Sequence, residues 1–187
     1  MLSHSFFISH TEEFFTFYRN RLLNLDAEPN DAHKVLAKLE RRKKLKAIVT
    51  QNVDGLHQKA GNKNVFELHG SVHRNYCNPC RRSYSVETVK GSRGIPRCAC
   101  GGIIKPDVVL YEESLDPEVL RQSIKAITKA DMLIVGGTSL NVYPAAGLLQ
   151  FYSGKKLVLI NRTTTAFDSR ADLVIHDSIG KTLLEVI

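Results

Sequence analysis

The sequence predicts an α/β protein in which helices flank a parallel sheet, with a small cysteine-rich lobe and a helical module attached. Short apolar runs of strand length recur from residue 45 onward, and helical or loop segments separate most of them. Near-continuous runs of Val, Ile and Leu that alternate with helices are typical of a parallel sheet covered on both faces. All four cysteines lie in one polar block that interrupts this alternation.

Composition limits the class of protein. A chain of 187 residues with 43% hydrophobic content is long enough and apolar enough to bury a core. No run approaches the roughly 18 apolar residues that cross a bilayer, and the N-terminal stretch lacks the features of a signal peptide. We therefore expect a soluble cytoplasmic protein that has no membrane partner.

The charge of the chain is basic but moderate. A net charge of +7 allows an acidic partner without requiring one. Part of the excess lies in the basic run at residues 41–46, which closes a helical segment. Cations favour the negative end of a helix dipole, so we interpret this run as a solvated helix end. A phosphate-binding patch is the alternative.

The first part of the chain is expected to be helical. We assign residues 1–28 to a helical module of a small domain, because Glu12 and Glu13 suit a first helical turn and apolar side chains follow at helical spacing. These apolar side chains are Phe14, Phe17, Tyr18, Leu22 and Leu25. A second helix is expected to begin near Asn30 and to end in the basic run.

The remaining apolar runs are expected to form strands at residues 45–50, 65–68, 107–111, 131–137, 156–161 and 171–176. We assign residues 29–75 and 104–187 to the discontinuous domain that contains their parallel sheet. Ligands of such sheets bind beyond the carboxyl ends of the strands. Polar residues gather at these ends, which predicts a nucleotide site: Thr50, Gln51, Asn52, His69, Gly136 to Ser139, and Asn161.

Residues 76–103 are expected to be an inserted metal-binding lobe. Two close cysteine pairs, separated by 17 residues, suit a tetrahedral zinc site: Cys77 and Cys80, then Cys98 and Cys100. Four thiolates leave no open position for water, so we expect one structural Zn²⁺ per chain. The segment between the pairs has little apolar surface, so metal would have to hold it together. A redox dithiol is the weaker alternative.

Several motifs in fixed order resemble a known family. They are TQNVDGLHQKAG (50–61), FELHGS (66–71), the cysteine pairs, GGIIKPDVVLYEE (101–113), GGTSLNVYPAAGL (136–148) and LVLIN (157–161). Together they resemble the sirtuins, which are NAD-dependent protein-lysine deacylases, over essentially the whole chain. The resemblance implies a Rossmann-like NAD-binding domain whose first strand is missing here, together with the zinc lobe and the helical module.

The resemblance implies a catalytic group of three residues at the nicotinamide half of NAD. His69 would be the general base that draws a proton from the ribose hydroxyls, since neutral imidazole suits this role. Gln51 and Asn52 would orient the nicotinamide ribose and a water, and Asp54 would accept a hydrogen bond from the carboxamide. His69, Asn52 and Asp54 are thus the catalytic candidates, and they bind the cofactor together with Gln51.

The same resemblance implies residues for the adenosine half of NAD. Gly137, Thr138 and Ser139 would hold ribose or phosphate at a glycine-rich turn. Asn161 would hold the adenosine ribose, with Ser178 as a neighbour.

Substrate residues follow in part from the resemblance. Val108 and Val109 would pair with the backbone of an acyl-lysine protein or peptide as an added strand. Tyr18 and Arg21 form a Tyr-x-x-Arg arrangement similar to the pair with which some sirtuins recognise succinyl- or malonyl-lysine. Such a pair is also ordinary on an amphipathic helix, so deacetylation is the leading expectation.

The sequence departs from the family pattern at its front. The family's opening strand, its Gly-Ala-Gly loop and its Pro-Asp-Phe-Arg segment do not occur in these residues. A helix N-terminus aimed at the pyrophosphate is the usual anion site of a dinucleotide fold. We therefore expect an N-terminally truncated chain with weak NAD binding and impaired activity. The alternative is that these residues belong to a longer protein that contains the missing segment.

Three other functions remain open. One is a sirtuin of the desuccinylase or demalonylase type. Another is a non-catalytic, zinc-containing protein-binding fragment. The last is a zinc-ribbon nucleic-acid protein, which explains neither residues 51–54 nor the GGTSLNVYP block and lacks aromatic residues for base stacking. Nucleic acid is therefore not an expected partner.

Overall fold

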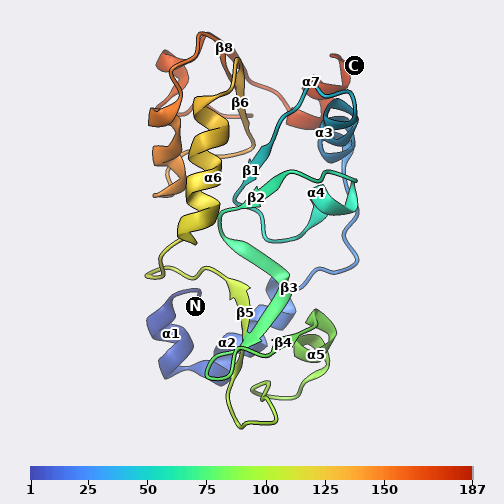
Figure 1. The fold of residues 1–187 in the computed structure, drawn as a ribbon, viewed down its shortest axis with the longest axis vertical. Helices are drawn as coiled ribbons and strands as arrows, with labels where there is room; N and C mark the ends of the chain where they lie inside the picture. Colours follow the sequence, from blue (N-terminus) through green and yellow to red (C-terminus); the bar gives the residue numbers. More distant parts are fainter. Residues whose placement is uncertain (187) are drawn as a thin grey trace. The chain divides into compact units, whose positions relative to one another are not determined.

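The structure, a computed structural model, describes residues 1–186 (Figure 1). The chain divides into two compact units, each assembled from three separate stretches. Unit 1 contains Met1–Ala27, Thr50–Gly55 and Glu67–Asp116, and unit 2 contains Glu28–Val49, Leu56–Phe66 and Pro117–Ile187. None of the helices in the described part is both long and apolar enough to span a membrane.

An aromatic core holds the helices of unit 1. The expected helical module consists of α1 (His4–Ser9) and α2 (Thr11–Arg21). The rings of Phe7 and Phe14 meet edge to face with centroids 4.9 Å apart, a favourable geometry for aromatic pairs. Phe15 and Tyr18 complete the cluster and are at most 1% exposed. The helical spacing seen in the sequence therefore corresponds to a buried face of α2.

A small antiparallel sheet forms the rest of unit 1. Its strands β3 (Gly70–Cys77), β4 (Ser83–Tyr84) and β5 (Ile104–Val108) lie in the order β4-β3-β5, and the helix α5 (Val86–Gly91) follows β4. The expectation that residues 107–111 add a strand to the parallel sheet is wrong. The chain turns back through the cysteine lobe after β3, and β5 therefore pairs antiparallel with β3.

Unit 2 contains the expected parallel sheet. Its strands β6 (Leu133–Gly136), β7 (Leu157–Ile160) and β8 (Leu173–Ile175) pair in parallel and in sequence order. The helices of this unit include α3 (Asp31–Arg41), α6 (Pro117–Thr128) and α7 (Ile179–Leu184). Two short 3₁₀ helices also occur, at Ala145–Phe151 and Asp168–Arg170.

The central strand β7 has both faces covered. Leu157 and Leu159 pack with Leu149 of the first 3₁₀ helix, whereas Ile160 packs with Val35 of α3 and Leu183 of α7. Alternate strand residues therefore enter two separate apolar clusters. This arrangement explains the near-continuous apolar run of β7, because neither face of the strand meets solvent.

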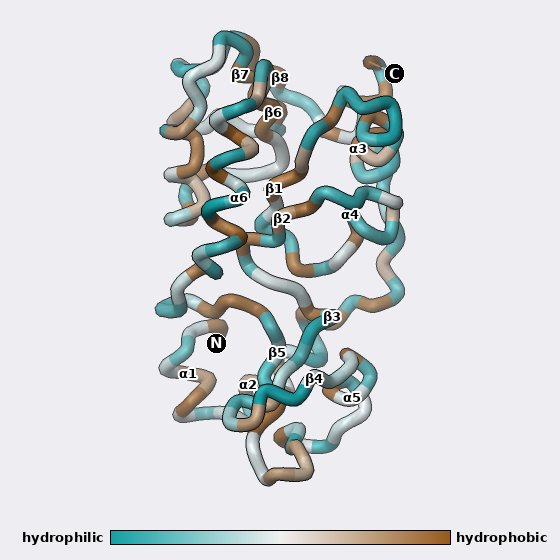
Figure 2. The backbone as a smooth tube through the Cα atoms, in the orientation of Figure 1, coloured by the Kyte–Doolittle hydropathy of each residue, from teal (hydrophilic) through white to brown (hydrophobic). Residues whose placement is uncertain are grey.

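Two short strands lie where the chain passes between the units. β1 (Ile48–Thr50) pairs with β2 (Val65–Glu67), and α4 (Leu56–Lys59) lies between them in the sequence. Within unit 2, Ile48 donates its backbone N–H to the Asn64 carbonyl. Figure 2 shows hydrophobic colouring at β1 and along the β6–β8 sheet, as the apolar runs predict.

The two units divide the chain differently from the expected domains. Residues 50–55, 67–75 and 104–116 were expected in the NAD-binding domain, but they fall in unit 1 with the cysteine lobe. The pairing of β3 with β5 ties the last two stretches into one antiparallel sheet, and the bond from the Val72 N–H to the Val53 carbonyl joins the first stretch to it. The boundary after Ala27 lies within one residue of the expected end of the helical module at residue 28.

Candidate active site and metal centre

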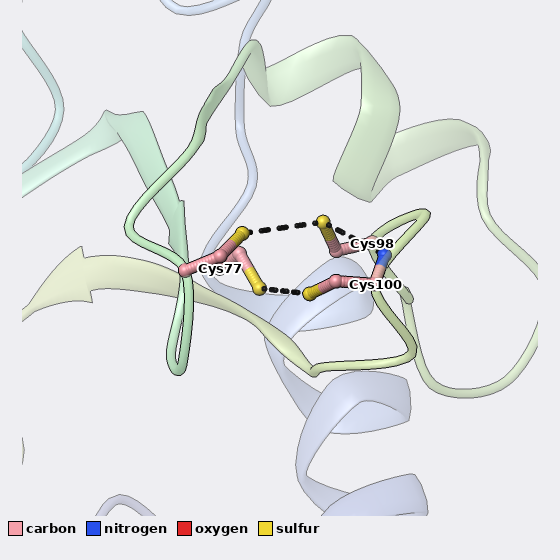
Figure 3. Close-up of side chains that lie close together, drawn as sticks. Cys77, Cys98 and Cys100 are labelled. Carbon is pink, nitrogen blue, oxygen red and sulfur yellow. Dashed lines mark hydrogen bonds between the residues drawn. The ribbon is translucent and has the colours of Figure 1, made fainter.

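The four cysteines converge at one point of unit 1, as the sequence predicts. Their sulfur atoms all lie within 4.8 Å of one another. Figure 3 shows the sulfurs pointing toward a shared centre, with Cys77 Sγ 3.4 Å from Cys100 Sγ and Cys80 Sγ 3.6 Å from Cys98 Sγ. A tetrahedral Zn²⁺ with Zn–S bonds of about 2.3 Å places its sulfurs about 3.8 Å apart. The donor set and its spacing therefore fit zinc.

Local backbone geometry forms the metal centre. Gly101 has a φ of +83° and closes a turn in which its N–H donates to the Cys98 carbonyl. At Gly102, a Cβ atom would overlap the Pro79 ring and approach Cys77 Sγ to 2.8 Å. The one-residue spacing of the second cysteine pair therefore depends on the two glycines that follow it.

The thiols differ in acidity. Hydrogen bonds from the Cys100 backbone N–H and from the Tyr84 hydroxyl lower the pKa of Cys98 to about 6. Burial raises the pKa of Cys77 to about 12. A bound Zn²⁺ would hold all four residues as thiolates. Because the thiols must lose their protons to bind it, the affinity for zinc rises with pH.

His69 lies in the tight connection between β2 and β3. Its Nδ1 lies 3.2 Å from the Gln51 carbonyl oxygen. A carbonyl only accepts hydrogen bonds, so Nδ1 carries a proton, and the lone pair of the neutral form of the ring therefore lies at Nε2. This tautomer is the one that a general base needs. The Gln51 backbone thus sets the protonation pattern of the expected catalytic histidine.

The segment Gln51 to Gly55 is a loop fixed by hydrogen bonds within unit 1. Asn52 donates its backbone N–H to Thr50 Oγ1, at 3.0 Å. The Val53 carbonyl accepts from the Val72 N–H, and the Asp54 carbonyl lies 2.9 Å from His73 Nε2. The structure therefore brings the expected nicotinamide residues Gln51, Asn52 and Asp54 together with His69 in one unit.

The proposed substrate strand lies directly beside His69. Val109 donates its N–H to the His69 carbonyl at 3.0 Å, and Val108 pairs with Gly70. Gly70 has a φ of +76°, and a Cβ there would overlap the Asp107 carbonyl. Only glycine lets the two backbones approach this closely. Val108 and Val109 are thus held next to the histidine.

The Tyr18 and Arg21 pair is not gathered into a carboxylate-binding site. Tyr18 is 1% exposed within the aromatic core, and burial raises the pKa of its hydroxyl. Arg21 is exposed and lines a surface hollow formed mainly by α2. The Tyr-x-x-Arg spacing therefore has an ordinary structural explanation, since its tyrosine packs on Phe14.

A second group of expected residues converges in unit 2. A hollow of about 700 Å³ at the carboxyl ends of β6 and β7 is lined by Gly137, Thr138, Ser139, Asn161 and Ser178, among others. The Thr138 N–H donates to Asn161 Oδ1 at 3.0 Å. Asn161 Nδ2 is buried and has no hydrogen-bond partner within residues 1–186. A ligand acceptor at Nδ2 would remove an unsatisfied-donor cost of about 1–3 kcal/mol.

Two cations that the sequence analysis did not single out also line this hollow. Arg162 follows Asn161 directly, so its place at a strand end was a signal for it. Lys181 lies on α7 and pairs with Asp177 at 2.7 Å. Its position depends on the packing of α7, and no local sequence pattern points to it. Both side chains bring positive charge to a site expected to hold a dinucleotide.

Comparison with known proteins identifies the family. The model of the Sir2 family matches residues 1–144 of this chain. The chain belongs to the Sir2 family. Its sirtuin fold, with a Rossmann-like sheet and a four-cysteine cluster, agrees with the expected fold class.

Close relatives of this sirtuin carry names that state an activity. A Clostridium acetobutylicum protein named NAD-dependent protein deacetylase is 62% identical over all of this chain, which covers 77% of that protein. A Staphylococcus aureus protein of the same name is 44% identical over 98% of the chain, and 77% of it is covered. The chain thus spans about three quarters of these curated relatives.

Solved structures give the same result. A structure described as Sir2 with p53 peptide and NAD⁺ superposes with a TM-score of 0.95 and 40% identity, over 100% of this chain and 80% of that one. A structure described as Sir2 bound to acetylated peptide matches with a TM-score of 0.95 and 40% identity, over 99% and 81% of the two chains.

Proposed function

We propose that this sirtuin removes acetyl groups from protein lysine in an NAD-dependent reaction. The observation that carries the proposal is the 3.2 Å contact between His69 Nδ1 and the Gln51 carbonyl oxygen, which leaves Nε2 as the ring nitrogen that can accept a proton. The names of the close relatives and the peptide-bound and NAD⁺-bound structures support the same reaction.

The residues of the chain divide the work. When bound, NAD supplies the ribose carbon that accepts the acyl oxygen and the nicotinamide that leaves. His69 Nε2 takes a proton from the ribose, while Asn52 and Asp54 orient the nicotinamide end. Val108 and Val109 hold the peptide backbone by β-augmentation, which places the acyl-lysine beside His69. The hollow around Asn161 holds the adenosine end.

The zinc in this proposal is structural. Four cysteine ligands complete a tetrahedral shell, so no position remains for substrate or water. Its contribution is to close the loop between β3 and β5. β3 begins directly after His69, and β5 ends at Val108 of the proposed substrate strand. We expect one Zn²⁺ per chain, retained in variants of His69.

The test of the proposal is His69→Ala. We expect a loss of NAD-dependent deacetylation of about 10²–10⁴-fold, the usual range for removal of a general base. Zinc content and thermal stability measured in parallel serve as controls, because the side chain lies outside the metal centre. Comparable turnover by His69→Ala and the parent chain would refute the assignment of His69 as the base.

Two finer alternatives are separated by further assays. A desuccinylase or demalonylase activity would appear as faster turnover of succinyl- or malonyl-lysine than of acetyl-lysine peptides. The burial of Tyr18 gives this alternative no support. A non-catalytic binding fragment would bind acyl-lysine peptide without turnover.

We propose, as the sequence suggests, that these 187 residues alone bind NAD weakly and turn over slowly, since they contain no Gly-Ala-Gly loop. Calorimetry of NAD binding tests this directly. We expect weak binding by this chain and tighter binding by a version that carries a relative's N-terminal segment. Equal affinity of the two would show that the residues present suffice.

A further inference from the structure

The pairing of β3 with β5 contains an irregularity beside the candidate active site. Ser71 pairs with Asp107, but the next paired residues are Asn75 and Pro106. Asp107 and Pro106 are consecutive in β5, so Val72, His73 and Arg74 are extra residues of β3 that have no pairing partner in β5. Such bulges often occur next to active sites, where they change the direction of side chains. We call residues 72–74 the β3 bulge.

The first two residues of the β3 bulge hold the loop that contains Asp54. The Val72 N–H donates to the Val53 carbonyl at 2.9 Å, and His73 Nε2 lies 2.9 Å from the Asp54 carbonyl. Because a carbonyl only accepts, this ring carries its proton at Nε2. The adjoining Gly55 has a φ of +71°, and a Cβ there would lie 2.8 Å from the His73 ring. The loop therefore packs directly on His73.

The third residue of the β3 bulge joins two other segments. Arg74 Nε donates to Asp107 Oδ2 and Arg74 Nη1 donates to Glu67 Oε2, each at 2.7 Å. Glu67 lies two residues before His69, and Asp107 directly precedes the proposed substrate strand. Burial lowers the pKa of Arg74, but these two carboxylates outweigh it and raise the net pKa. The guanidinium thus stays charged and joins both segments.

The bulge is itself held in shape from within. Asn75, which is 1% exposed, donates from Nδ2 to the Val72 carbonyl at 3.3 Å. The His73 N–H donates to Ser71 Oγ at 3.3 Å. These bonds satisfy backbone groups that the interrupted strand pairing leaves open. The bulge is therefore a defined structure and not a loose stretch of strand.

We propose that the β3 bulge positions the site, with His73 positioning the Asp54 loop for nicotinamide and Arg74 positioning the His69 end against the substrate strand. This inference rests on the proposed function for the roles of Asp54, His69 and Val108. It adds two positioning residues and assigns them separate effects. His73 acts on the NAD side of the reaction, and Arg74 acts on the peptide side.

The test for His73 compares two substitutions. His73→Phe keeps a ring against Gly55 but removes the N–H donor, whereas His73→Gln keeps a donor at similar reach. We expect His73→Phe to raise KM for NAD and the nicotinamide concentration for half inhibition about fivefold, as loss of one hydrogen bond allows. His73→Gln should recover most of this, and KM for peptide should stay constant. His10→Phe is the matched control, because it makes the same substitution at an exposed histidine that follows α1.

The test for Arg74 uses the peptide as its readout. Arg74→Met removes both charge-assisted bonds and should raise KM for peptide about tenfold with a smaller change in KM for NAD. Arg74→Lys can keep only one of the two bonds, so its KM for peptide should lie between those of the parent chain and Arg74→Met. Arg93→Met, at an exposed arginine of the same unit, is the control. Parallel changes in both KM values for the His73 and Arg74 variants would overturn the separate positioning roles.

Hydrogen exchange keeps the inference independent of turnover. Backbone amides of residues 53–55 should exchange about fivefold faster in His73→Phe and unchanged in His10→Phe. Unchanged exchange in His73→Phe overturns the inference even in an active protein. Absence of deacetylation by the parent chain, with faster exchange in His73→Phe, overturns the proposed function and leaves the positioning of the loop supported.

Discussion

The two units of the molecule assemble their candidate site residues in different ways. In unit 2, Gly137, Thr138 and Asn161 gather because parallel strands end at the same edge of a sheet. In unit 1, Asp54, His69 and Val108 lie on a loop, a strand connection and an antiparallel strand, and side chains of the β3 bulge hold them. Topology alone therefore places one half of the expected NAD site, whereas the other half depends on individual side chains.

This difference has a consequence for mutation. A site formed by strand ends tolerates changes in its polar residues, because the sheet persists without them. A site held by single glycines, cysteines and charged side chains loses its geometry when one of them changes. We therefore expect larger and more local effects in unit 1 than in unit 2.

The largest expected effect is a loss of structure at the metal centre, and it should be confined to unit 1. Cys98→Ser should abolish zinc binding and unfold the lobe between β3 and β5, since structural zinc contributes about 10–16 kcal/mol in small zinc-finger peptides. Metal analysis and hydrogen exchange measure it, with Ser83→Ala as the control in the same lobe. Faster exchange should appear in β3 and β5 but not in β6–β8. One zinc per chain in the variant would contradict the four-cysteine assignment.

A pair of glycine substitutions compares the units directly. Gly70 and Gly137 both have positive φ, at +76° and +66°, but a Cβ meets the Asp107 carbonyl at the first and nothing within 4 Å at the second. Gly137→Ala should lower the free energy of unfolding by about 1–2 kcal/mol, because alanine is strained in the left-handed backbone conformation. Gly70→Ala adds overpacking and should cost about 3 kcal/mol or more. Denaturant unfolding followed in each unit measures this, and equal costs would remove the distinction.

Substitutions of Asn161 test the strand-end site of unit 2. Asn161→Asp keeps the acceptor for the Thr138 N–H but loses the buried Nδ2 donor, whereas Asn161→Ala loses both. If Nδ2 binds the adenosine end, both variants should weaken NAD binding about tenfold by calorimetry. Weakening by Asn161→Ala alone would mean that Asn161 only supports the Thr138 turn.

The smallest expected effect concerns acid stability. Burial would raise the pKa of Glu113, but the Leu110 N–H, His4 and Lys105 lower its net pKa. A depressed pKa contributes stability above the unfolded value near 4.3, and this contribution is lost as pH falls through the folded value. Glu113→Gln should therefore lower the stability of unit 1 by about 1 kcal/mol at pH 7, with no difference from the parent in strong acid.

Asp177 in unit 2 is the matched carboxylate. Lys181 and the Ser178 N–H lower its pKa, but the pair with Lys181 is largely exposed. Asp177→Asn should change stability less than Glu113→Gln does, because exposed ion pairs contribute little. A larger pH-dependent loss in Asp177→Asn would reverse the expected order of the two units.

The sequence predicted those parts of the fold that local pattern determines. Helical spacing predicted α2 and α3, and near-continuous apolar runs predicted β6, β7 and β8. The run at residues 107–111 was assigned to the wrong sheet, because an apolar run does not reveal its pairing partner. The return of the chain through the cysteine lobe decides that β5 pairs with β3.

The candidate site was predictable to a similar extent. The cysteine spacing and the polar strand ends of unit 2 are local signals, and the structure brings both groups together. Tyr18 was assigned to substrate binding, although its spacing from Phe14 already fits the buried face of α2. The β3 bulge had no sequence signal, since it arises from the register between two strands that the whole cysteine lobe separates in the chain.

The interleaving of the two units also sets an order of folding during synthesis. All of unit 1 has left the ribosome once Asp116 has emerged, so its aromatic core and metal centre can form while translation continues. Helix α3 of unit 2 is made before Asp116, but Ile179 and Leu183, against which Val35 packs, are translated only after all of unit 1. The apolar face of α3 therefore lacks these partners until all of unit 1 has been made, and it is a surface that a nascent-chain chaperone would meet in that interval.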